Sequence, residues 1–171
     1  FDDVNVIIGQ GTAGLECVEQ LSQIGVVPDI VLCCCGGGGL IAGVSTAIKA
    51  KFENADIYSV EPEFFDDTKR SLKENKIIEN SMKHKSICDA LLTDKPGNIT
   101  FPINKKNLTS GISVTDKEAL IAMHSAYKHL KIVLEPGGAV ALAAAITKKI
   151  DIKNKNVLVI ASGGNVDKDV F

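Results

Sequence analysis

Four consecutive glycines stand at positions 36–39, between two apolar stretches of the chain. The apolar residues 30–35 before them do not alternate with polar residues, which is typical of a strand buried on both faces of a parallel sheet. Residues 40–51 after them place apolar side chains at helical spacing. The sequence therefore predicts a strand, a glycine turn and a helix in that order, and this unit belongs in an α/β fold.

A turn made of four glycines is well suited to hold an anion. Without Cβ atoms, consecutive backbone N–H groups converge on one point, and the following helix adds unpaired N–H groups and the positive end of its dipole. A plain strand–helix turn needs one or two glycines, and each further glycine costs about 0.5–1 kcal/mol in ordered structure. We therefore expect a phosphate at this loop. Its sequence lacks the Lys-Ser/Thr ending of a nucleoside-triphosphate loop.

Two glycine patterns also match the dinucleotide fingerprint G-x-G-x-x-G/A. Gly37, Gly39 and Ala42 form one match, with Glu61 beyond the next strand. Gly9, Gly11 and Gly14 form the other match, with Asp29 downstream. For this second set we expect instead a strand–helix turn with close packing. From the glycines alone, the phosphate could belong to a mononucleotide, a dinucleotide or another cofactor.

The rest of the chain alternates strands with helices. Besides the central unit, strands are expected at residues 4–8, 56–60, 111–114 and 156–161. Helices are expected at residues 13–24, after residue 62 through residue 72, at 115–130 and at 139–148. Thr12 is the expected cap of the first of these helices and Gly25 its stop, while Thr115 and Glu118 form a capping box. This order predicts helices on both faces of a mostly parallel sheet.

Three groups of polar residues follow predicted strands or open a helix, where ligands of such folds bind. Ser162 stands beside two glycines and can meet a ligand heteroatom, although a simple turn explains it equally well. Glu61 and Asp67 could hold a hard cation, although acids also favour a helix N-terminus. Glu135, before Pro136, is explained by a helix start.

Composition narrows the functional classes. The chain has 171 residues and a formal net charge of −2, which disfavours a nucleic-acid surface. No apolar run reaches the roughly 20 residues that a bilayer span needs. The five cysteines lack disulfide or zinc spacing, so we expect buried thiols and a cytoplasmic protein. The chain starts at Phe1 without Met, and we expect a fragment of a longer protein.

Taken together, the motifs resemble the fold-type II pyridoxal-phosphate enzymes, in particular the threonine dehydratase and serine racemase family. The segments Gly-Gly-Gly-Gly-Leu-Ile-Ala-Gly from Gly36, Leu-Glu-Pro-Gly-Gly-Ala from Leu134 and Ser-Gly-Gly-Asn from Ser162 carry the resemblance, with Glu61-Pro62. They occur in the family's order and spacing across essentially the whole chain. The resemblance implies a three-layer α/β fold like that of the tryptophan synthase β subunit, present in part. It also implies that residues 1–10 return from the small domain and that 11–171 belong to an incomplete large cofactor-binding domain.

The resemblance also implies site residues. Those that would contact pyridoxal 5′-phosphate are Gly36, Gly37, Gly38, Gly39 and Leu40 at the phosphate, Ser162 at the pyridine nitrogen, and Glu135 nearby. Glu61, the carbonyl of Phe65, and Asp67 match the site for Mg²⁺, Mn²⁺ or Ca²⁺ in metal-dependent members. In the segment beginning at Ser86, Ala90 stands where the family usually has glycine.

The implied activity is β-elimination on a hydroxy amino acid such as threonine, serine or 3-hydroxyaspartate, which gives a 2-oxo acid and ammonia. A serine racemase of the same family is the close alternative, and a non-catalytic phosphate- or nucleotide-binding domain is the alternative from another class. The family's catalytic lysine, in a Ser-x-Phe-Lys pattern, has no match in these residues. We therefore expect that lysine upstream, an inactive isolated chain, and a full-length enzyme that is a homodimer.

Overall fold

The fold is described by a computed structural model that covers residues 1–81 and 83–171. In this part of the chain, four parallel strands form one sheet in the order β3-β2-β1-β4. The strands are β1 (Ile30–Cys34), β2 (Asp56–Pro62), β3 (Ser110–Val114) and β4 (Val157–Ile160). The strands predicted around residues 30–35, 56–60, 111–114 and 156–161 are thereby confirmed.

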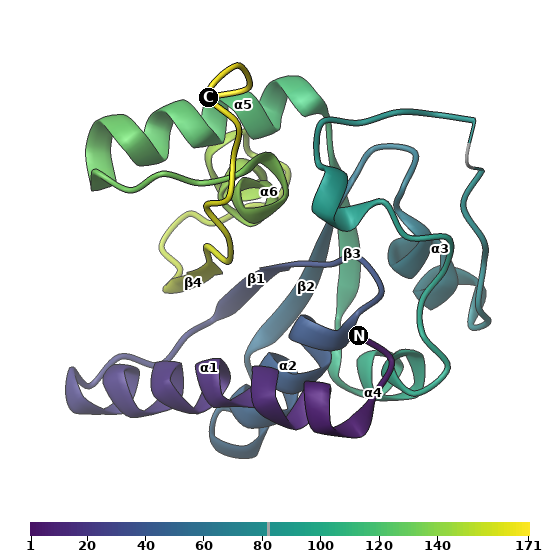
Figure 1. The fold of residues 1–171 in the computed structure, drawn as a ribbon. Helices are drawn as coiled ribbons and strands as arrows, with labels where there is room; N and C mark the ends of the chain where they lie inside the picture. The colour runs from purple at the N-terminus through teal and green to yellow at the C-terminus, as the bar shows by residue number, and fades with distance from the viewer. Residues whose placement is uncertain (82) are drawn as a thin grey trace.

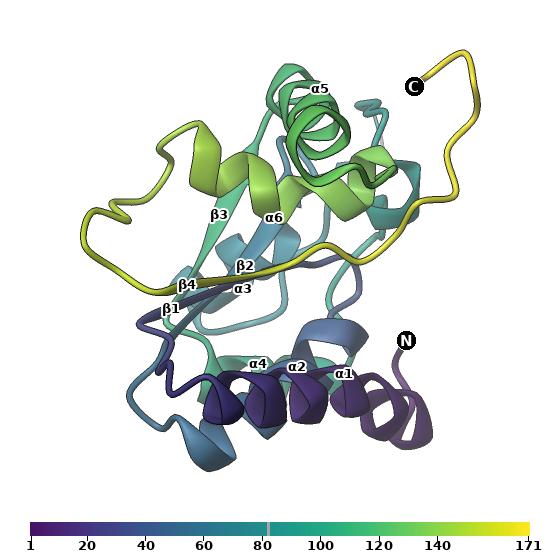
Figure 2. The ribbon, with the colours of Figure 1, turned by 90° about the vertical axis from the view of Figure 1, so that its left-hand side faces the viewer.

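Helices cover both faces of the sheet, as Figures 1 and 2 show. They are α1 (Val4–Gln23), α2 (Gly39–Lys51), α3 (Asp67–Glu74), α4 (Thr100–Asn107), α5 (Asp116–Ser125) and α6 (Pro136–Ile146). Figure 2 places α5 and α6 on one side and α1, α2 and α4 on the other. The three-layer α/β architecture with a parallel sheet is therefore confirmed.

The central strand β1 supplies both cores by simple alternation. Its residues Ile30, Leu32 and Cys34 join the core under α5 and α6. Val31, Cys33 and the next residue, Cys35, join the core under α2. All residues of the strand are buried, as its continuous apolar sequence predicts. Three consecutive cysteines thus face alternate layers, and all five cysteines of the chain are free thiols.

The N-terminal segment differs from the prediction. The strand expected at residues 4–8 is wrong, because α1 runs without a break from Val4 to Gln23. Asp3 caps this helix by accepting hydrogen bonds from the N–H groups of Asn5 and Val6. Thr12, the expected cap, lies in mid-helix, where its hydroxyl donates to the Gly9 carbonyl at 2.6 Å. The β-branched residues of this segment are helical although they favour strands, because α1 packs on α2. Such tertiary contacts override weak intrinsic propensities.

The glycines of α1 serve helix packing. The turn expected at Gly9, Gly11 and Gly14 is wrong. The expected close packing is found at Gly11 and Gly14, whereas a Cβ added at Gly9 would meet nothing within 4 Å. A Cβ added at Gly14 would lie 2.8 Å from the Ala47 Cβ of α2, and one at Gly43 of α2 would lie 2.3 Å from the Ile7 carbonyl oxygen. Gly14 and Gly43 let the two helix backbones approach each other. A dinucleotide site at the Gly9 set is excluded, because it would need a strand and a turn where α1 is continuous.

Helix ends follow local signals elsewhere. The capping box of Thr115 and Glu118 is present at the start of α5, which continues into a wider π-type turn at Ala126–Leu130. Pro136 opens α6, a helix buried on nearly every side. The sequence did not predict α4.

No helix in the described residues is long and apolar enough to cross a bilayer.

Candidate cofactor site

The glycine loop connects the end of β1 to the start of α2, as predicted. Gly38 caps α2 in a left-handed conformation with φ of 93°, which a residue with a Cβ rarely adopts. The Gly37 carbonyl accepts hydrogen bonds from the Thr100 hydroxyl at 2.7 Å and the Gly97 N–H at 3.2 Å. The Gly38 carbonyl accepts one from the Asn104 side-chain amide at 3.2 Å.

These contacts hold the Gly37 and Gly38 carbonyls and do not involve the N–H groups of the loop. Within the described residues, the N–H groups of Gly36, Gly37 and Gly38 take part in no loop or turn hydrogen bond. The first N–H groups of α2, from Gly39 and Leu40, have no partner within the helix by geometry. The loop can therefore offer several converging donors to an anion.

A second pair of motifs interlocks beside this loop. The Glu135 N–H donates to the Gly163 carbonyl at 3.0 Å, and the Asn165 N–H donates to the Glu135 carboxylate at 3.1 Å. A Cβ added at Gly163 would lie 2.6 Å from Glu135 Oε1, and one at Gly138 would lie 2.5 Å from the Gly163 carbonyl oxygen. Gly138 is thus explained by close backbone approach and Gly163 by the Glu135 carboxylate, and these contacts hold the segment of Ser162 against that of Glu135.

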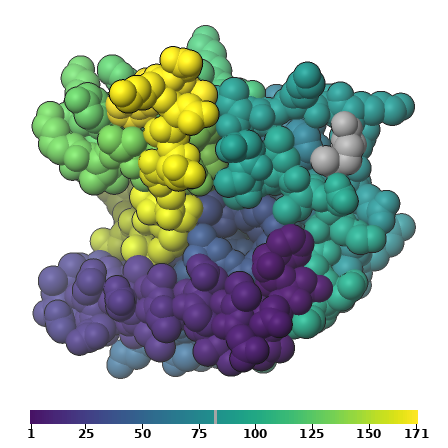
Figure 3. All heavy atoms as spheres, in the orientation of Figure 1, coloured from purple at the N-terminus to yellow at the C-terminus, as the bar shows by residue number. Residues whose placement is uncertain are grey.

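One pocket of about 250 Å³ unites these elements. It is lined by all seven residues predicted to contact the cofactor: Gly36, Gly37, Gly38, Gly39, Leu40, Glu135 and Ser162. Figure 3 shows a hollow on this face, bordered by the N-terminal residues in purple, residues of the middle of the chain in teal and the C-terminal segment in yellow. The structure brings the predicted residues together, and their binding of a cofactor stays a prediction.

The pocket also includes residues that sequence reasoning did not assign. These are Phe1, Cys34, Cys35, Ala90, Leu91, Thr93 and Gly137. Phe1 lies against the glycine loop: a Cβ added at Gly37 would be only 2.1 Å from the Phe1 ring. Ala90 is the position where the family that the chain resembles usually has glycine, and that resemblance was the available signal for it.

Cys34 lies directly beside Ser162, with 3.0 Å between Sγ and Oγ. Hydrogen bonding by Cys33 and by Ser162 lowers the pKa of the Cys34 thiol, against the opposing effect of burial. Burial and the Glu61 charge raise the pKa of the Cys35 thiol well above its usual range. The three adjacent thiols therefore differ in acidity, and of these three thiols only that of Cys34 contacts Ser162.

The two acidic residues of the predicted cation site do not line this pocket: Glu61 lies near the end of β2, and Asp67 begins α3. The Glu61 carboxylate is fully buried and accepts hydrogen bonds from the N–H groups of Thr68 at 2.7 Å and Lys69 at 2.8 Å. Burial, followed by the charge of Asp67, raises the pKa of Glu61 well above its usual range. Asp67 Oδ1 accepts from the Asn80 amide, while the buried Asp67 Oδ2 has no partner among the described residues. Burial raises the pKa of Asp67 to about 6.

Burial disfavours the charged form of both carboxylates, and a cation beside them would offset that cost. The unpartnered Asp67 Oδ2 is the observation that fits this chemistry, because a buried charged oxygen without a partner is costly. Within the described residues, no group of three or more His, Cys, Asp or Glu side chains is arranged to hold a metal. A site here would therefore need backbone oxygen as well as the two carboxylates.

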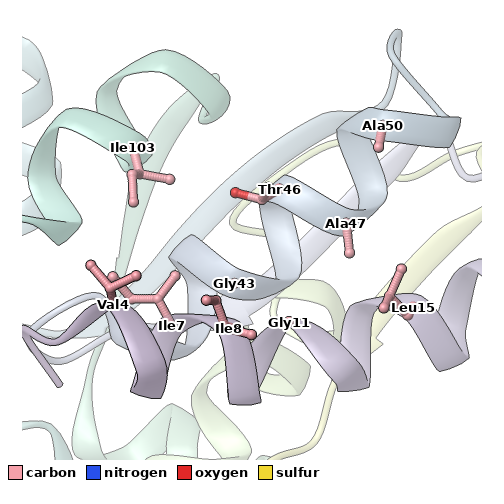
Figure 4. A pocket seen from close by; sticks show the side chains of 10 residues that line it. All are labelled: Val4, Ile7, Ile8, Gly11, Leu15, Gly43, Thr46, Ala47, Ala50 and Ile103. Carbon is pink, nitrogen blue, oxygen red and sulfur yellow. The ribbon is translucent and has the colours of Figure 1, made fainter.

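Another pocket, shown in Figure 4, has a different character. It has a volume of about 470 Å³, lies between α1 and α2, and reaches Ile103 of α4. Thr46 carries the one side-chain polar group in its lining, and that hydroxyl already donates to the Ala42 carbonyl at 2.8 Å. This pocket offers no donor set for a phosphate.

The chain is thus an α/β protein whose glycine-lined pocket lies at the carboxyl ends of parallel strands, the place where such folds bind phosphate-bearing cofactors. Residues 1–163 match the family described as pyridoxal-phosphate dependent enzymes, and the chain belongs to that family.

Known relatives cover nearly the whole chain. Serine racemase from Dictyostelium discoideum is 40% identical over 170 residues, which are 98% of this chain and 51% of that protein. L-threonine ammonia-lyase from Thermotoga maritima is 36% identical over 171 residues, which are 100% of this chain and 41% of that protein. The crystal structure of a threonine deaminase from T.th. superposes with a TM-score of 0.91 at 38% identity, over 98% of this chain and 56% of that one. The chain thus spans about half the length of the relatives that it matches.

Proposed function

We propose that the full-length protein binds pyridoxal 5′-phosphate in the pocket described above. The N–H groups at Gly36, Gly37, Gly38, Gly39 and Leu40 would hold the phosphate, Ser162 would face the pyridine nitrogen, and Glu135 would lie beside the ring. The observation that carries the proposal is that one pocket is lined by all of these residues. Family membership supports the choice of this cofactor over a nucleotide.

When bound, this cofactor supplies an electron sink for negative charge that develops at the substrate's α-carbon. Ser162 would contribute a neutral hydroxyl at the ring nitrogen, where a carboxylate would instead stabilise the protonated ring. The Ser162 hydroxyl would therefore keep the electron sink weak, which would favour prompt loss of a β-hydroxyl group. Thr100 and Asn104 would support the phosphate loop, because their side chains donate hydrogen bonds to the Gly37 and Gly38 carbonyls and so hold its backbone in place.

The proposed reaction is β-elimination on a small hydroxy amino acid such as threonine, serine or 3-hydroxyaspartate, which yields a 2-oxo acid and ammonia. Similarity to an L-threonine ammonia-lyase and to a threonine deaminase structure supports it. Racemisation of serine is the second candidate, since a serine racemase is 40% identical to this chain. The same residues would serve both reactions.

Further parts of this proposal concern the whole protein. Residues 1–10 would return from a small domain, and residues 11–171 would form part of the large domain. The catalytic lysine would lie outside these 171 residues, so the isolated chain would show no turnover. The full-length enzyme would be a cytoplasmic homodimer.

Addition of the cofactor to purified full-length protein tests the proposal. We expect visible absorbance from the bound cofactor, followed by conversion of L-threonine, L-serine or 3-hydroxyaspartate. Release of 2-oxo acid would establish the lyase, and D-amino acid would establish the racemase. A protein that gains no visible absorbance would instead be a non-catalytic phosphate-binding domain.

We also propose a cation site formed by Glu61, the Phe65 carbonyl and Asp67, which would hold Mg²⁺, Mn²⁺ or Ca²⁺. The unpartnered Asp67 Oδ2 and the burial of both carboxylates support it. A cation here would order the start of α3 and stabilise the domain, because it would neutralise buried charge. It lies outside the cofactor pocket, so its role would be structural.

Thermal unfolding of chelator-treated full-length protein tests the cation site. Each of the three cations that binds there should raise the unfolding temperature at pH 7, and Asp67→Asn should abolish the increase. Since folding raises the pKa of Asp67 from 3.8 to about 6, the metal-free protein should lose about 3 kcal/mol of stability as pH rises through that interval. The cation should therefore stabilise more at pH 7 than at pH 5. Asp66→Asn is the matched control, and a response that survives Asp67→Asn would disprove the site.

A further inference from the structure

Cys34 is placed beside Ser162 by strand register. β1 and β4 are parallel neighbours, and Cys33 lies opposite Ile160. Cys34 is the next residue of β1, while Ser162 follows β4 by two residues, so both stand at the carboxyl edge of the sheet. Cys34 is 4% exposed, and its sulfur lies 3.0 Å from Ser162 Oγ. The contact therefore follows from the fold and requires no flexible side chain.

The three adjacent cysteines have different surroundings. Cys33 lies in the core under α2, and its thiol donates to the Cys34 carbonyl at 3.5 Å. The Cys35 thiol contacts the Gly36 carbonyl and the Thr68 hydroxyl, each at 3.4 Å. Cys34 lines the pocket on the side of Ser162 and Glu135. A merely apolar residue would fill the same space without a donor toward Ser162.

The chemistry of the contact depends on one hydrogen atom. A serine hydroxyl has one hydrogen to donate and two lone pairs to accept with. When the Cys34 S–H donates to Ser162 Oγ, the Ser162 hydrogen is free to point into the pocket, where it suits an acceptor. When Ser162 donates to the sulfur instead, Ser162 can only accept on the pocket side. An unprotonated ring nitrogen is an acceptor and a protonated one is a donor.

We propose that Cys34 is a positioning residue whose S–H donates to Ser162 Oγ and thereby directs the Ser162 hydrogen at an unprotonated ring nitrogen of the cofactor. The proposal rests on the function proposed above. It makes Cys34 part of the arrangement that keeps the electron sink weak, although Cys34 itself need not touch the ring. The sulfur acts on the reaction only through the orientation of the Ser162 hydroxyl.

Two variants of the full-length enzyme, C34A and C34S, test this proposal. C34A removes the donor, whereas C34S keeps a donor at the same place. The readouts are the dissociation constant of pyridoxal phosphate and the pH at which the visible spectrum of the bound cofactor changes. Since a neutral hydrogen bond is worth about 0.5–1.5 kcal/mol, C34A should weaken cofactor binding roughly 2- to 10-fold. It should also shift the spectral transition along the pH axis, and C34S should restore both.

The matched control is C33A, which removes a neighbouring buried thiol that faces the opposite layer. It should lower the unfolding temperature and leave the spectral transition unchanged. If C34A behaves like C33A, with reduced stability but an unchanged transition, Cys34 is a packing residue and the proposal is overturned. Parent protein that takes up no cofactor would overturn the proposed function together with this inference. Parent protein that binds it, with an unchanged C34A, would overturn this inference alone.

Discussion

Two glycine-rich segments of this chain look alike in sequence and differ in what they do. Gly9, Gly11 and Gly14 lie within α1, where Gly11 and Gly14 let its backbone approach α2. The glycines at positions 36–39 form a loop between β1 and α2, with carbonyls fixed by α4 and N–H groups left toward a pocket. The comparison teaches that glycine spacing alone does not identify a phosphate loop. The element that precedes the glycines determines whether they can form a phosphate loop, because only the end of a strand places such a loop at the edge of the sheet.

The largest expected effect comes from the packing glycines. Gly43→Ala should destabilise the full-length protein by about 3 kcal/mol, since its Cβ would lie 2.3 Å from the Ile7 carbonyl oxygen and the two helix backbones must separate. The measurement is thermal or denaturant unfolding with and without pyridoxal phosphate. The loss should be the same in both conditions, and a loss confined to the cofactor-bound protein would contradict the packing role.

A smaller stability effect and a specific binding effect are expected from the loop. Gly38→Ala forces a Cβ onto a φ of 93° and places it 2.5 Å from the Asn104 amide nitrogen, at a cost of about 1–2 kcal/mol. Because the strain falls on the loop N–H groups, affinity for pyridoxal phosphate should drop about 10-fold or more in a cofactor titration. Pyridoxal, which lacks the phosphate, is the control ligand and should lose much less affinity. Equal losses for both ligands would show that the loop does not hold the phosphate.

The hydroxyl that supports the loop should have a milder effect. Thr100→Val removes the 2.7 Å hydrogen bond to the Gly37 carbonyl, which keeps its second donor from Gly97. We expect a loss of about 1 kcal/mol and roughly 5-fold weaker binding of pyridoxal phosphate, measured by the same titration. Thr100→Ser keeps the hydroxyl and should bind like the parent. If Thr100→Val binds pyridoxal phosphate as tightly as the parent, the hydrogen bond to Gly37 does not support the loop.

Local signals predicted much of the fold. Continuous apolar sequence identified β1, and the Thr115 capping box identified the start of α5. Helix α4 carried no such signal, because the group that caps its start comes from far away in the sequence. The Asp2 carboxylate accepts hydrogen bonds from the N–H groups of Asn98, Ile99 and Thr100. A contact across almost a hundred residues cannot be inferred from the pattern of one segment.

The same limit applies to the site. The loop glycines, Glu135 and Ser162 could be proposed from their motifs, and they line one pocket. The contact between Cys34 and Ser162 could not, since it depends on the register of β1 against β4. The wrong prediction of a strand at residues 4–8 has a similar cause. The short β-branched run is compatible with a strand, but packing against α2 favours a helix.

The smallest expected change in stability comes from an α1 glycine that no neighbouring residue contacts, in contrast to the α1 glycines that pack against α2. Gly9 is an exposed position within α1, and a Cβ added there would meet nothing within 4 Å. Gly9→Ala should therefore stabilise the protein by about 0.5–1 kcal/mol, because alanine loses less backbone entropy in a helix. Gly25→Ala is the matched control, since that site is equally open but has a φ of 68°. It should destabilise the protein by about 1 kcal/mol or more. Thermal unfolding of both variants measures the difference, and a destabilising Gly9→Ala would mean that all three α1 glycines are constrained by packing.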